Sequence, residues 1–349
     1  MQTKYFVVDK EEPDQQIMKE AAELLKQGGL VAFPTETVYG LGANGLDGEA
    51  VAKIYEAKGR PSDNPLILHI ANRQELAQLV ISISPNAQAL IDAYWPGPLT
   101  VVLKRSEIVP DIVSGGLDSV AVRLPGSVIA RQLISLAGVP IAAPSANTSG
   151  RPSPTSAQAV LTDLDGRIDG VIDGGDCAIG LESTVVDCTT PVPTLLRPGG
   201  ITMEMLINTL GDIEIDPTLG GSAECAPKSP GMKYTHYAPM APMILFEGHH
   251  SEVQDLMLTE IEKALESGQK VGAIVSAETA QHLPENVIVA IYGQRAQIAE
   301  IAGNLYTALR SFDDRTVDVI YAEGIDEEGL GLAVMNRLRK ASGYNIIRG

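Results

Sequence analysis

The segment Gly29-Leu-Val-Ala-Phe-Pro-Thr-Glu-Thr-Val-Tyr-Gly-Leu-Gly42 joins a short apolar run to a loop of hydroxyl residues and glycines. The run from residue 29 to 33 is typical of a buried strand, and the polar residues follow where that strand ends. Apolar residues recur at helical spacing over residues 14–28, and a second helix fits residues 48–58. Helices that alternate with buried strands predict an α/β fold.

Further short runs of apolar and β-branched residues continue this pattern along the first part of the chain. Their lengths and flanking turn residues favour strands of one mixed sheet, which we expect to be twisted. The segments are 66–70, 99–103, 119–123, 140–143, 170–173 and 184–187.

Turn-forming residues replace this pattern between residues 199 and 243. Within them, Ser229-Pro-Gly-Met-Lys-Tyr-Thr-His-Tyr-Ala-Pro239 gathers three ring side chains and a lysine, which favours an ordered linker over a flexible spacer. Strands and helices alternate regularly after it, as in a parallel sheet covered by helices. No G-x-G-x-x-G follows a strand there, so a dinucleotide site is unsupported. We therefore predict a domain over 1–205, a linker over 206–241 and a smaller domain over 242–349.

The composition excludes several classes of protein. The chain has 349 residues, a formal net charge of −18 and 44% hydrophobic residues, which is typical of a globular protein rather than a disordered one. It contains no apolar run long enough for a bilayer and no signal-peptide core at the N-terminus. Three scattered cysteines do not make a disulfide framework or a zinc site. We expect a cytoplasmic protein with no membrane partner and no strong direct binding to nucleic acid.

The charge is unevenly distributed. Residues 51–151 carry nine Lys and Arg against seven Asp and Glu, a local charge of +2, which leaves −20 for the rest. Chance variation along the surface would explain this distribution. An anion site inside an acidic protein would explain it as well.

Lys58 and Arg60 flank a glycine at the predicted end of a helix. A planar guanidinium and a compact ammonium that converge on one point suit the oxygens of a phosphate. Capping of the helix end explains one cation and the glycine. It does not explain the rigid Arg-Pro-x-x-Asn-Pro that follows.

A third polar cluster, Pro144-Ser-Ala-Asn-Thr-Ser-Gly-Arg-Pro-Ser-Pro154, follows the strand at 140–143. Hydroxyl and amide groups at the carboxyl end of a strand are a common place to bind phosphate groups. Composition alone slightly favours an unliganded loop here, and it leaves the loop after Phe33 equally open between a ligand site and a turn.

Several familiar catalytic motifs do not occur in the sequence. It lacks G-x-x-x-x-G-K-[ST], G-x-S-x-G and H-E-x-x-H, and its five histidines do not have metal-ligand spacing. We therefore expect neither a P-loop, nor a serine nucleophile on an elbow, nor a zinc protease, and no metal held by protein side chains.

Taken together, Lys58-Gly-Arg60, Ser145-Ala-Asn147 and their Pro-Thr-Glu-Thr-Val-Tyr-Gly-Leu and Pro-Ser-Ala-Asn-x-Ser-Gly contexts resemble the YrdC-like family. The linker motif and the βα domain after it are similar to the longer, two-domain form of that family. The resemblance implies a catalytic first domain, a linker that covers the active site and a Rossmann-like second domain. It also implies a nucleotidyltransferase reaction: L-threonine, bicarbonate or CO2 and ATP give threonylcarbamoyl-AMP and pyrophosphate, for modification of tRNA next to the anticodon.

The resemblance also implies roles for individual residues. The catalytic group is Lys58, Arg60, Ser145 and Asn147. The L-threonine pocket is formed by Thr35, His69, Arg123, Ala143 and Ser183, with Arg123 pairing with the substrate carboxylate. ATP is bound by Lys58, Arg60, Asn64, Ser119, Ser145, Asn147, Ser153, Arg197, Tyr234, His236 and Tyr237.

Mg²⁺ is expected to reach the site on the ATP phosphates, and the product is expected to pass to the tRNA threonylcarbamoyl transferase machinery. Two alternatives remain on the same fold. One is an RNA-binding module, which the net charge of −18 disfavours. The other is a carbamoyltransferase-type enzyme, whose usual zinc-finger segments have no Cys-x-x-Cys counterpart here.

Overall fold

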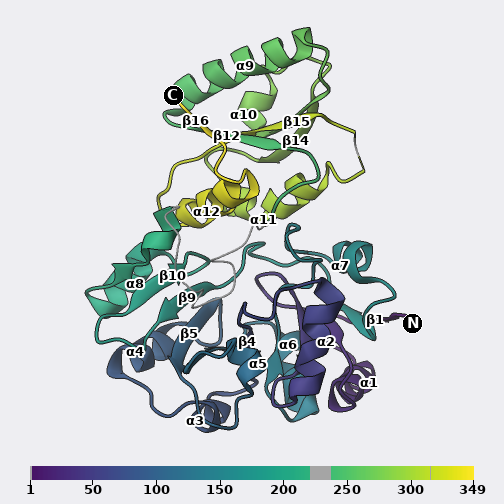
Figure 1. The fold of residues 1–349 in the computed structure, drawn as a ribbon, viewed down its shortest axis with the longest axis vertical. Helices are drawn as coiled ribbons and strands as arrows, with labels where there is room; N and C mark the ends of the chain where they lie inside the picture. Colours follow the sequence, from purple (N-terminus) through teal and green to yellow (C-terminus); the bar gives the residue numbers. More distant parts are fainter. Residues whose placement is uncertain (1, 221–236, 315) are drawn as a thin grey trace. The chain divides into compact units, whose positions relative to one another are not determined.

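The computed structural model describes residues 2–220, 237–314 and 316–349. Contacts divide the chain into two compact units, which Figure 1 shows. The N-terminal unit comprises Met1–Ser149, Ser153–Ala178 and Glu182–Lys233, and the C-terminal unit comprises Gly150–Pro152, Ile179–Leu181 and Tyr234–Gly349. None of the helices in the described ranges is long and apolar enough to cross a membrane.

Eleven strands of the described residues form one mixed sheet in the N-terminal unit, which confirms the predicted fold class. In sheet order they are β1 (Lys4–Val7), β8 (Gly170–Asp173), β2 (Val31–Pro34), β3 (Tyr39–Asn44), β7 (Ile141–Ala142), β4 (Ile67–His69), β6 (Ser119–Arg123), β5 (Leu99–Lys104), β9 (Thr184–Asp187), β10 (Thr194–Arg197) and β11 (Glu214–Ile215).

The helices of this unit are mostly short, and all but α3 and α5 of those described begin at a side-chain cap. They are α1 (Gln15–Lys26), α2 (Gly48–Lys58), α3 (Leu76–Leu79), α4 (Pro85–Tyr94), α5 (Asp111–Ser114), α6 (Val128–Ala137), α7 (Ala157–Leu164) and α8 (Met203–Leu210), with 3₁₀ turns η1 (Arg73–Glu75) and η2 (Pro217–Gly220). Helix α2 has its predicted bounds because the Asp47 side chain caps its start and Gly59, at φ 62°, ends it.

The two faces of the sheet pack against different helices. In β2, Ala32 belongs to the larger core, to which α2, α4, α7 and α8 contribute. Val31 and Phe33 point the other way, into a second core made with α1 and α6. This alternation follows from the two-residue period of a strand and explains why the strand sequence is apolar throughout.

Strand β3 corrects the expectation of a loop after Phe33. Residues 39–42 pair antiparallel with β2 instead, and Ala43 and Asn44 pair antiparallel with β7. A Cβ on Gly42 would lie 2.8 Å from both Ile141 Cγ2 and Phe33 Cε1, closer than carbon atoms pack. The glycine is therefore needed for close packing inside a strand rather than for a turn.

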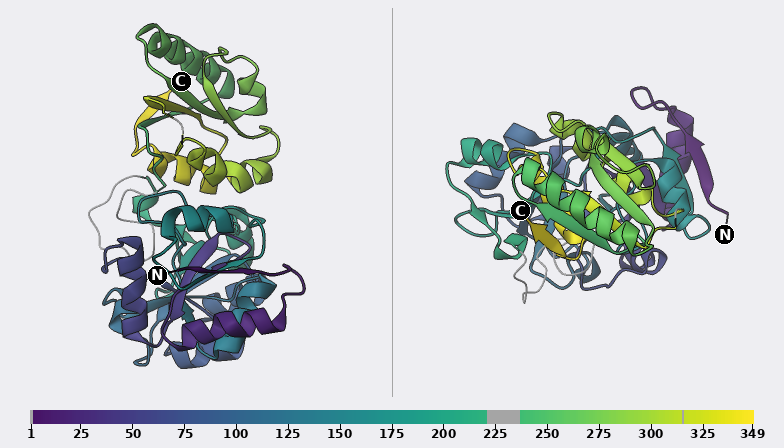
Figure 2. Two further views of the ribbon diagram at one scale, coloured as in Figure 1. Left: turned by 90° about the vertical axis from the view of Figure 1, so that its right-hand side faces the viewer. Right: turned by 90° about the horizontal axis from the view of Figure 1, so that it is seen from above.

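The described residues of the C-terminal unit form a five-stranded sheet in which every pairing is parallel, as predicted. Helix α9 lies on one face, and α11 and α12 lie on the other (Figures 1 and 2). In sheet order the strands are β14 (Ile288–Gly293), β13 (Val271–Ser276), β15 (Val319–Glu323), β12 (Met243–Glu247) and β16 (Ile346–Arg348), and the helices are α9 (His250–Glu266), α10 (Ala277–Ala280), α11 (Ile298–Arg310) and α12 (Gly331–Ala341).

Candidate functional site

One face of the N-terminal sheet carries several predicted residues. Strands β4, β6 and β5 are neighbours, and their residues Leu68, Val122 and Val101 point into the helix-covered core. The alternate residues make a small separate cluster of Ile67, Val102, Ala121, Val185 and Leu196. His69, Arg123 and Thr100 share a face with that cluster because each is two residues from one of its members. We call this surface the site face.

Arg123 ends β6 and is 4% exposed. Its Nη2 donates to Glu36 Oε1 at 2.6 Å and its Nη1 donates to the Thr37 hydroxyl at 2.9 Å. The Thr37 hydroxyl lies 2.7 Å from that of Thr35, which is also buried. Thr35 and Arg123, two of the residues predicted to bind L-threonine, are thus joined through Thr37, which was not among the predicted site residues.

His69 ends β4 and is the register partner of Arg123. Its Nδ1 lies 3.2 Å from the carbonyl oxygen of Ile67, which also accepts the Ala143 N–H at 2.9 Å. Complete burial, followed by the nearby Arg123 charge, lowers the pKa of His69 to about 3. The imidazole is therefore neutral at physiological pH, and Ala143 lies beside it.

Ser183 links the predicted L-threonine pocket to Arg197, a residue predicted to bind the phosphates of ATP. Its hydroxyl lies 2.8 Å from that of Thr100, the register partner of Arg123 in β5. Arg197, at the end of β10, donates from Nε to the Ser183 carbonyl at 3.0 Å and from Nη2 to its hydroxyl at 3.2 Å. Thr100 was not predicted, and it stands in a strand run with no local signal of function.

Lys58 is 1% exposed at the last position of α2. Its Nζ donates to the Ser145 carbonyl oxygen at 2.6 Å and to the Asn147 carbonyl oxygen. The Ser145 hydroxyl donates to Asn147 Oδ1 at 2.5 Å. Three of the four residues predicted as catalytic therefore lie in one hydrogen-bonded group, which we call the lysine cluster.

A continuous segment of the chain joins the lysine cluster to the residues predicted to bind L-threonine. Ala143 lies beside His69, and Ser145 follows two residues later in the same chain. The Leu41 N–H donates to the Pro144 carbonyl at 2.8 Å, and Gly40 pairs with Ser145 as an isolated bridge. Strand β3 therefore holds this segment, and the two predicted binding groups are neighbours.

Arg60 and Asn64 share the loop after α2. The Arg60 Nη2 donates to the Asn64 carbonyl at 3.2 Å and to the Pro65 carbonyl at 3.0 Å, so its acceptors differ from those of Lys58. Asn64 is 1% exposed, and its Oδ1 has no hydrogen-bond partner among the described residues. A buried amide in this state is unusual and fits a ligand contact.

The remaining predicted residues are placed as follows. The Ser153 hydroxyl donates to Glu182 Oε1 at 2.5 Å, and both residues are buried. Ser119 begins β6, four residues before Arg123, which puts the two about 13 Å apart along the strand. Tyr237 belongs to the C-terminal unit, where its ring packs against that of Tyr306 at 5.4 Å. Tyr234 and His236 lie outside the described residues.

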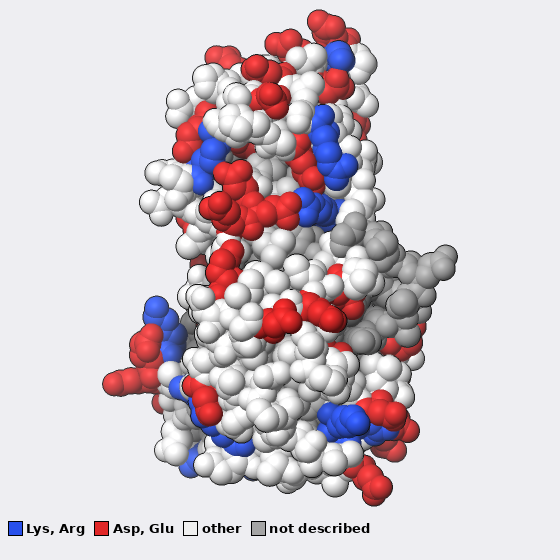
Figure 3. All heavy atoms as spheres, turned by 90° about the vertical axis from the view of Figure 1, so that its left-hand side faces the viewer, with Lys and Arg blue, Asp and Glu red and all other residues white. Residues whose placement is uncertain are grey.

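Burial separates the predicted cationic side chains from the acidic surface. Lys58, Arg123 and Arg197 are each at most 5% exposed. Figure 3 shows one face of the molecule, on which acidic side chains are exposed together with several Lys and Arg side chains. Of the nine cations in residues 51–151, Lys58 and Arg123 are therefore buried, whereas the other seven are exposed or half-buried.

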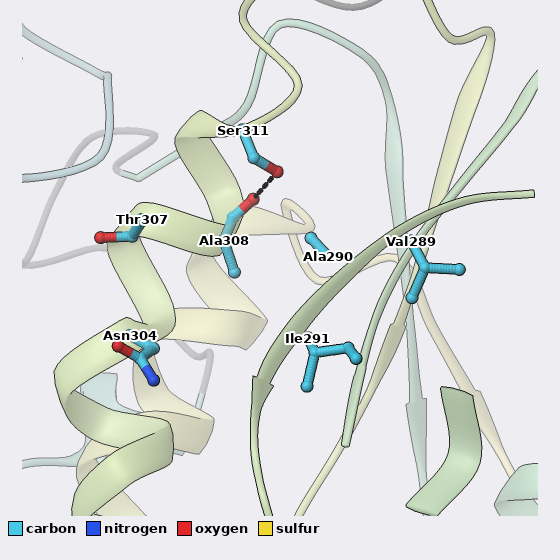
Figure 4. Close-up of a pocket in the computed structure, with 7 residues that line it drawn as sticks. All are labelled: Val289, Ala290, Ile291, Asn304, Thr307, Ala308 and Ser311. Atoms are coloured by element: carbon cyan, nitrogen blue, oxygen red, sulfur yellow. Dashed lines mark hydrogen bonds between the residues drawn. The ribbon is translucent and has the colours of Figure 1, made fainter. Parts of the chain in front are cut away.

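The structure offers no protein-built metal centre in the described residues, where no group of three or more His, Cys, Asp or Glu could hold an ion. A cavity of about 310 Å³ lies in the C-terminal unit between β14 and α11 (Figure 4). None of the predicted site residues lines it; its walls are Val289, Ala290, Ile291, Asn304, Thr307, Ala308 and Ser311.

Comparison with known proteins agrees with the predicted resemblance. The sequence pattern of the Sua5/YciO/YrdC family, described as "Telomere recombination", matches residues 23–199. The pattern described as "Threonylcarbamoyl-AMP synthase, C-terminal domain" matches residues 201–343.

Individual relatives match over nearly the whole chain. The threonylcarbamoyl-AMP synthase of Pyrococcus abyssi is 53% identical over 94% of this chain and 94% of its own length. That of Bacillus subtilis is 48% identical over the full length of both chains. A crystal structure of P. abyssi Sua5 complexed with L-threonine superposes with a TM-score of 0.95, at 51% identity over 99% of this chain and 100% of that one. The chain therefore belongs to the Sua5/YciO/YrdC family, in the two-domain form of the threonylcarbamoyl-AMP synthases.

Proposed function

We propose that the N-terminal unit joins L-threonine, bicarbonate or CO2 and ATP into threonylcarbamoyl-AMP and releases pyrophosphate. The observation that carries this proposal is the continuity between the lysine cluster and the His69–Arg123 pair through residues 143–145. The names of the relatives and the L-threonine complex of the P. abyssi protein support it.

L-Threonine would bind at the site face through its carboxylate. Protein acceptors take three of the five N–H groups of Arg123: Glu36, Thr37 and the Gly97 carbonyl. The two others form the donors that a carboxylate needs. Neutral His69 and the hydroxyls of Thr35 and Ser183 offer uncharged hydrogen-bond partners, and Ala143 supplies apolar contact.

ATP would bind along the lysine cluster and the adjoining strand ends. Lys58, Arg60 and Arg197 supply positive charge for the phosphates, and the side chains of Ser145, Asn147 and Ser153 supply hydrogen bonds. The buried amide of Asn64 would add a further hydrogen bond to the triphosphate, and Ser119 would lie near the nucleotide. These assignments follow the family motif and the unsatisfied Asn64 Oδ1.

The chemistry needs positioning and charge neutralisation rather than a protein nucleophile. The amine of L-threonine adds to CO2, which bicarbonate supplies by loss of water, and loses a proton to give N-carboxythreonine. A carboxylate oxygen of this carbamate then attacks the α-phosphorus of ATP. The bond from that phosphorus to the bridging oxygen breaks, and pyrophosphate leaves with the electron pair. Buried cations such as Lys58 offset the charge that develops. Burial raises the pKa of Cys188 to about 12 and raises that of Cys177 as well, so both thiols stay protonated.

Mg²⁺ would enter with ATP, held by phosphate oxygens and water. The donor set described above contains amides, hydroxyls and cations, which suit the phosphates better than the ion itself. The protein's part would be to hold those phosphates through Lys58 and Arg60.

The part of the predicted linker that follows α8 and β11 would cover the site and exclude water from the labile mixed anhydride. Tyr234 and His236 would take part in this closure together with Tyr237. We further propose that the reaction takes place in the cytoplasm and that the product passes to the machinery that modifies tRNA.

The test is pyrophosphate release by the full-length protein, with each substrate omitted in turn. Release should require L-threonine, bicarbonate and ATP together, and mass spectrometry should detect threonylcarbamoyl-AMP. Release that persists without threonine would contradict the proposal. Turnover of carbamoyl phosphate, or tight salt-dependent binding of RNA without any turnover, would favour one of the two alternatives on this fold.

A further inference from the structure

We propose that Glu36 is a positioning residue, which fixes the Arg123 guanidinium so that its remaining N–H groups meet the carboxylate of the amino-acid substrate. The inference rests on the proposed threonine site and deepens it. Glu36 stands in the same loop as Thr35 and was not among the predicted site residues.

The contact between the two side chains is short and shielded from water. Glu36 Oε1 accepts from Arg123 Nη2 at 2.6 Å, and the side chains are 18% and 4% exposed. A surface ion pair of this kind would have little energetic effect. Inside a protein, removal of one partner leaves a buried charge without compensation and is costly.

The other oxygen of Glu36 is also held. It accepts the N–H of Ser127 at 3.3 Å, at the residue that caps the start of α6. The backbone of Gly126 donates to the same carboxylate. One oxygen of Glu36 therefore bonds to the start of α6 while the other accepts from Arg123. The position of the carboxylate is fixed, and it fixes that of the guanidinium.

Arg123 is in turn held from three directions. Its Nε donates to the Gly97 carbonyl at 3.3 Å, its Nη1 to Thr37 and its Nη2 to Glu36. These acceptors come from two separate parts of the chain, residues 36–37 and Gly97, and they engage all three nitrogens, so the plane of the guanidinium is determined before a ligand arrives. A fork that is already oriented loses less entropy on binding than a free side chain.

The charge balance of the pair also suits an amino acid. Burial by itself raises the pKa of Glu36, but the Arg123 charge and the backbone N–H groups lower it by more. The pKa therefore lies below its usual value, and the carboxyl is ionised. The two charges cancel, and the pocket offers directed donors rather than a net positive charge. A zwitterionic substrate, which is itself neutral overall, fits such a pocket better than a phosphate does.

The experiment compares Glu36→Ala and Glu36→Gln with the wild-type enzyme. We expect Glu36→Ala to raise the KM for L-threonine by about tenfold or more and to leave the KM for ATP within about twofold. Glu36→Gln should be intermediate, because its amide oxygen can still accept from Arg123. Affinities for L-threonine and L-threonine amide, measured by calorimetry, should differ less in Glu36→Ala than in the wild type, because only the carboxylate distinguishes the two ligands.

Ser127→Ala is the matched structural control. It weakens the same helix start, where the Ser127 hydroxyl accepts from Ala130, and does not touch Arg123. It should lower the melting temperature without changing the ratio of the two affinities. If Glu36 acts only through Arg123, adding Glu36→Ala to Arg123→Lys should change the KM for threonine by less than about twofold.

Two results would overturn the inference. One is an unchanged ratio of affinities in Glu36→Ala, and the other is tighter binding of threonine, which would make Glu36 a competitor of the substrate. If Glu36→Ala does not fold, Glu36→Gln and the Arg123→Lys cycle with it decide the question. Loss of threonine dependence in the wild type would instead refute the proposed function.

Discussion

His69 and Arg123 are register partners at the carboxyl ends of the parallel strands β4 and β6. Both side chains are buried, so a neutral imidazole lies beside a permanent cation away from the surface. Each group limits the other: the guanidinium disfavours a proton on His69, and the neutral ring leaves Arg123 as the positive group of the pair. The relationship has a measurable consequence in the dependence of stability on pH.

The free energy of unfolding should fall as the pH drops below about 6.5, because the unfolded state then takes up a proton that buried His69 refuses until about pH 3. The contribution of this residue is up to about 1.4 kcal/mol per pH unit. When urea unfolding is measured at several pH values from about pH 5 to 6.5, the free energy of unfolding should therefore depend more steeply on pH in the wild type than in His69→Gln. His282→Gln, which removes an exposed ring, is the control. Equal slopes in the wild type and His69→Gln would contradict this prediction.

Lys58→Met should lower kcat/KM for ATP by about 100-fold or more, because it removes a buried cation that offsets phosphate charge. It should also destabilise the fold by about 1–3 kcal/mol, since the carbonyls of Ser145 and Asn147 lose their donor. Lys53→Met is the matched control, because Lys53 lies in the same helix as Lys58 and its Nζ donates to the Gly28 carbonyl. That variant should lose stability and keep its kinetics. Similar kinetic losses in both variants would show that only the stability of α2 matters.

Ser183→Ala should raise the KM for both threonine and ATP by about fivefold each, because one hydroxyl connects Thr100 with Arg197. Thr184→Val provides the comparison, since the neighbouring hydroxyl bonds to Ile201 instead. Steady-state kinetics with each substrate varied in turn distinguish the two variants. An effect on one substrate alone would mean that Ser183 does not couple the two binding groups.

In a Cys225→Ser background, the native protein should resist alkylation by iodoacetamide at about pH 8. Cys177 and Cys188 are both buried and their thiol pKa values are raised. Intact-mass measurement should find the folded chain unmodified and the denatured chain labelled at both positions. Rapid labelling of the folded chain would show that one of these thiols is accessible and ionised.

The sequence predicted elements whose signals are local. Helix α2 matched its predicted bounds because Asp47 and Gly59 mark its ends, and β6 and β9 matched because each is a compact apolar run. Strand β3 was missed because Gly40 and Gly42 imitate a turn in the sequence. The actual role of Gly42, to let Phe33 and Ile141 approach the backbone, depends on partners that the chain brings in from elsewhere.

The same division applies to the candidate site. The sequence by itself determined which residue types carry the chemistry, since the lysine cluster lies in two short motifs that can be recognised without a fold. Only the tertiary structure decided what those residues contact: Arg123 meets Glu36 across 87 positions, and Arg197 meets Ser183 through the end of another strand. Capping and strand formation depend on neighbours within a few positions, whereas the pairing of buried charges depends on sheet order and register, which the whole chain must fold to establish.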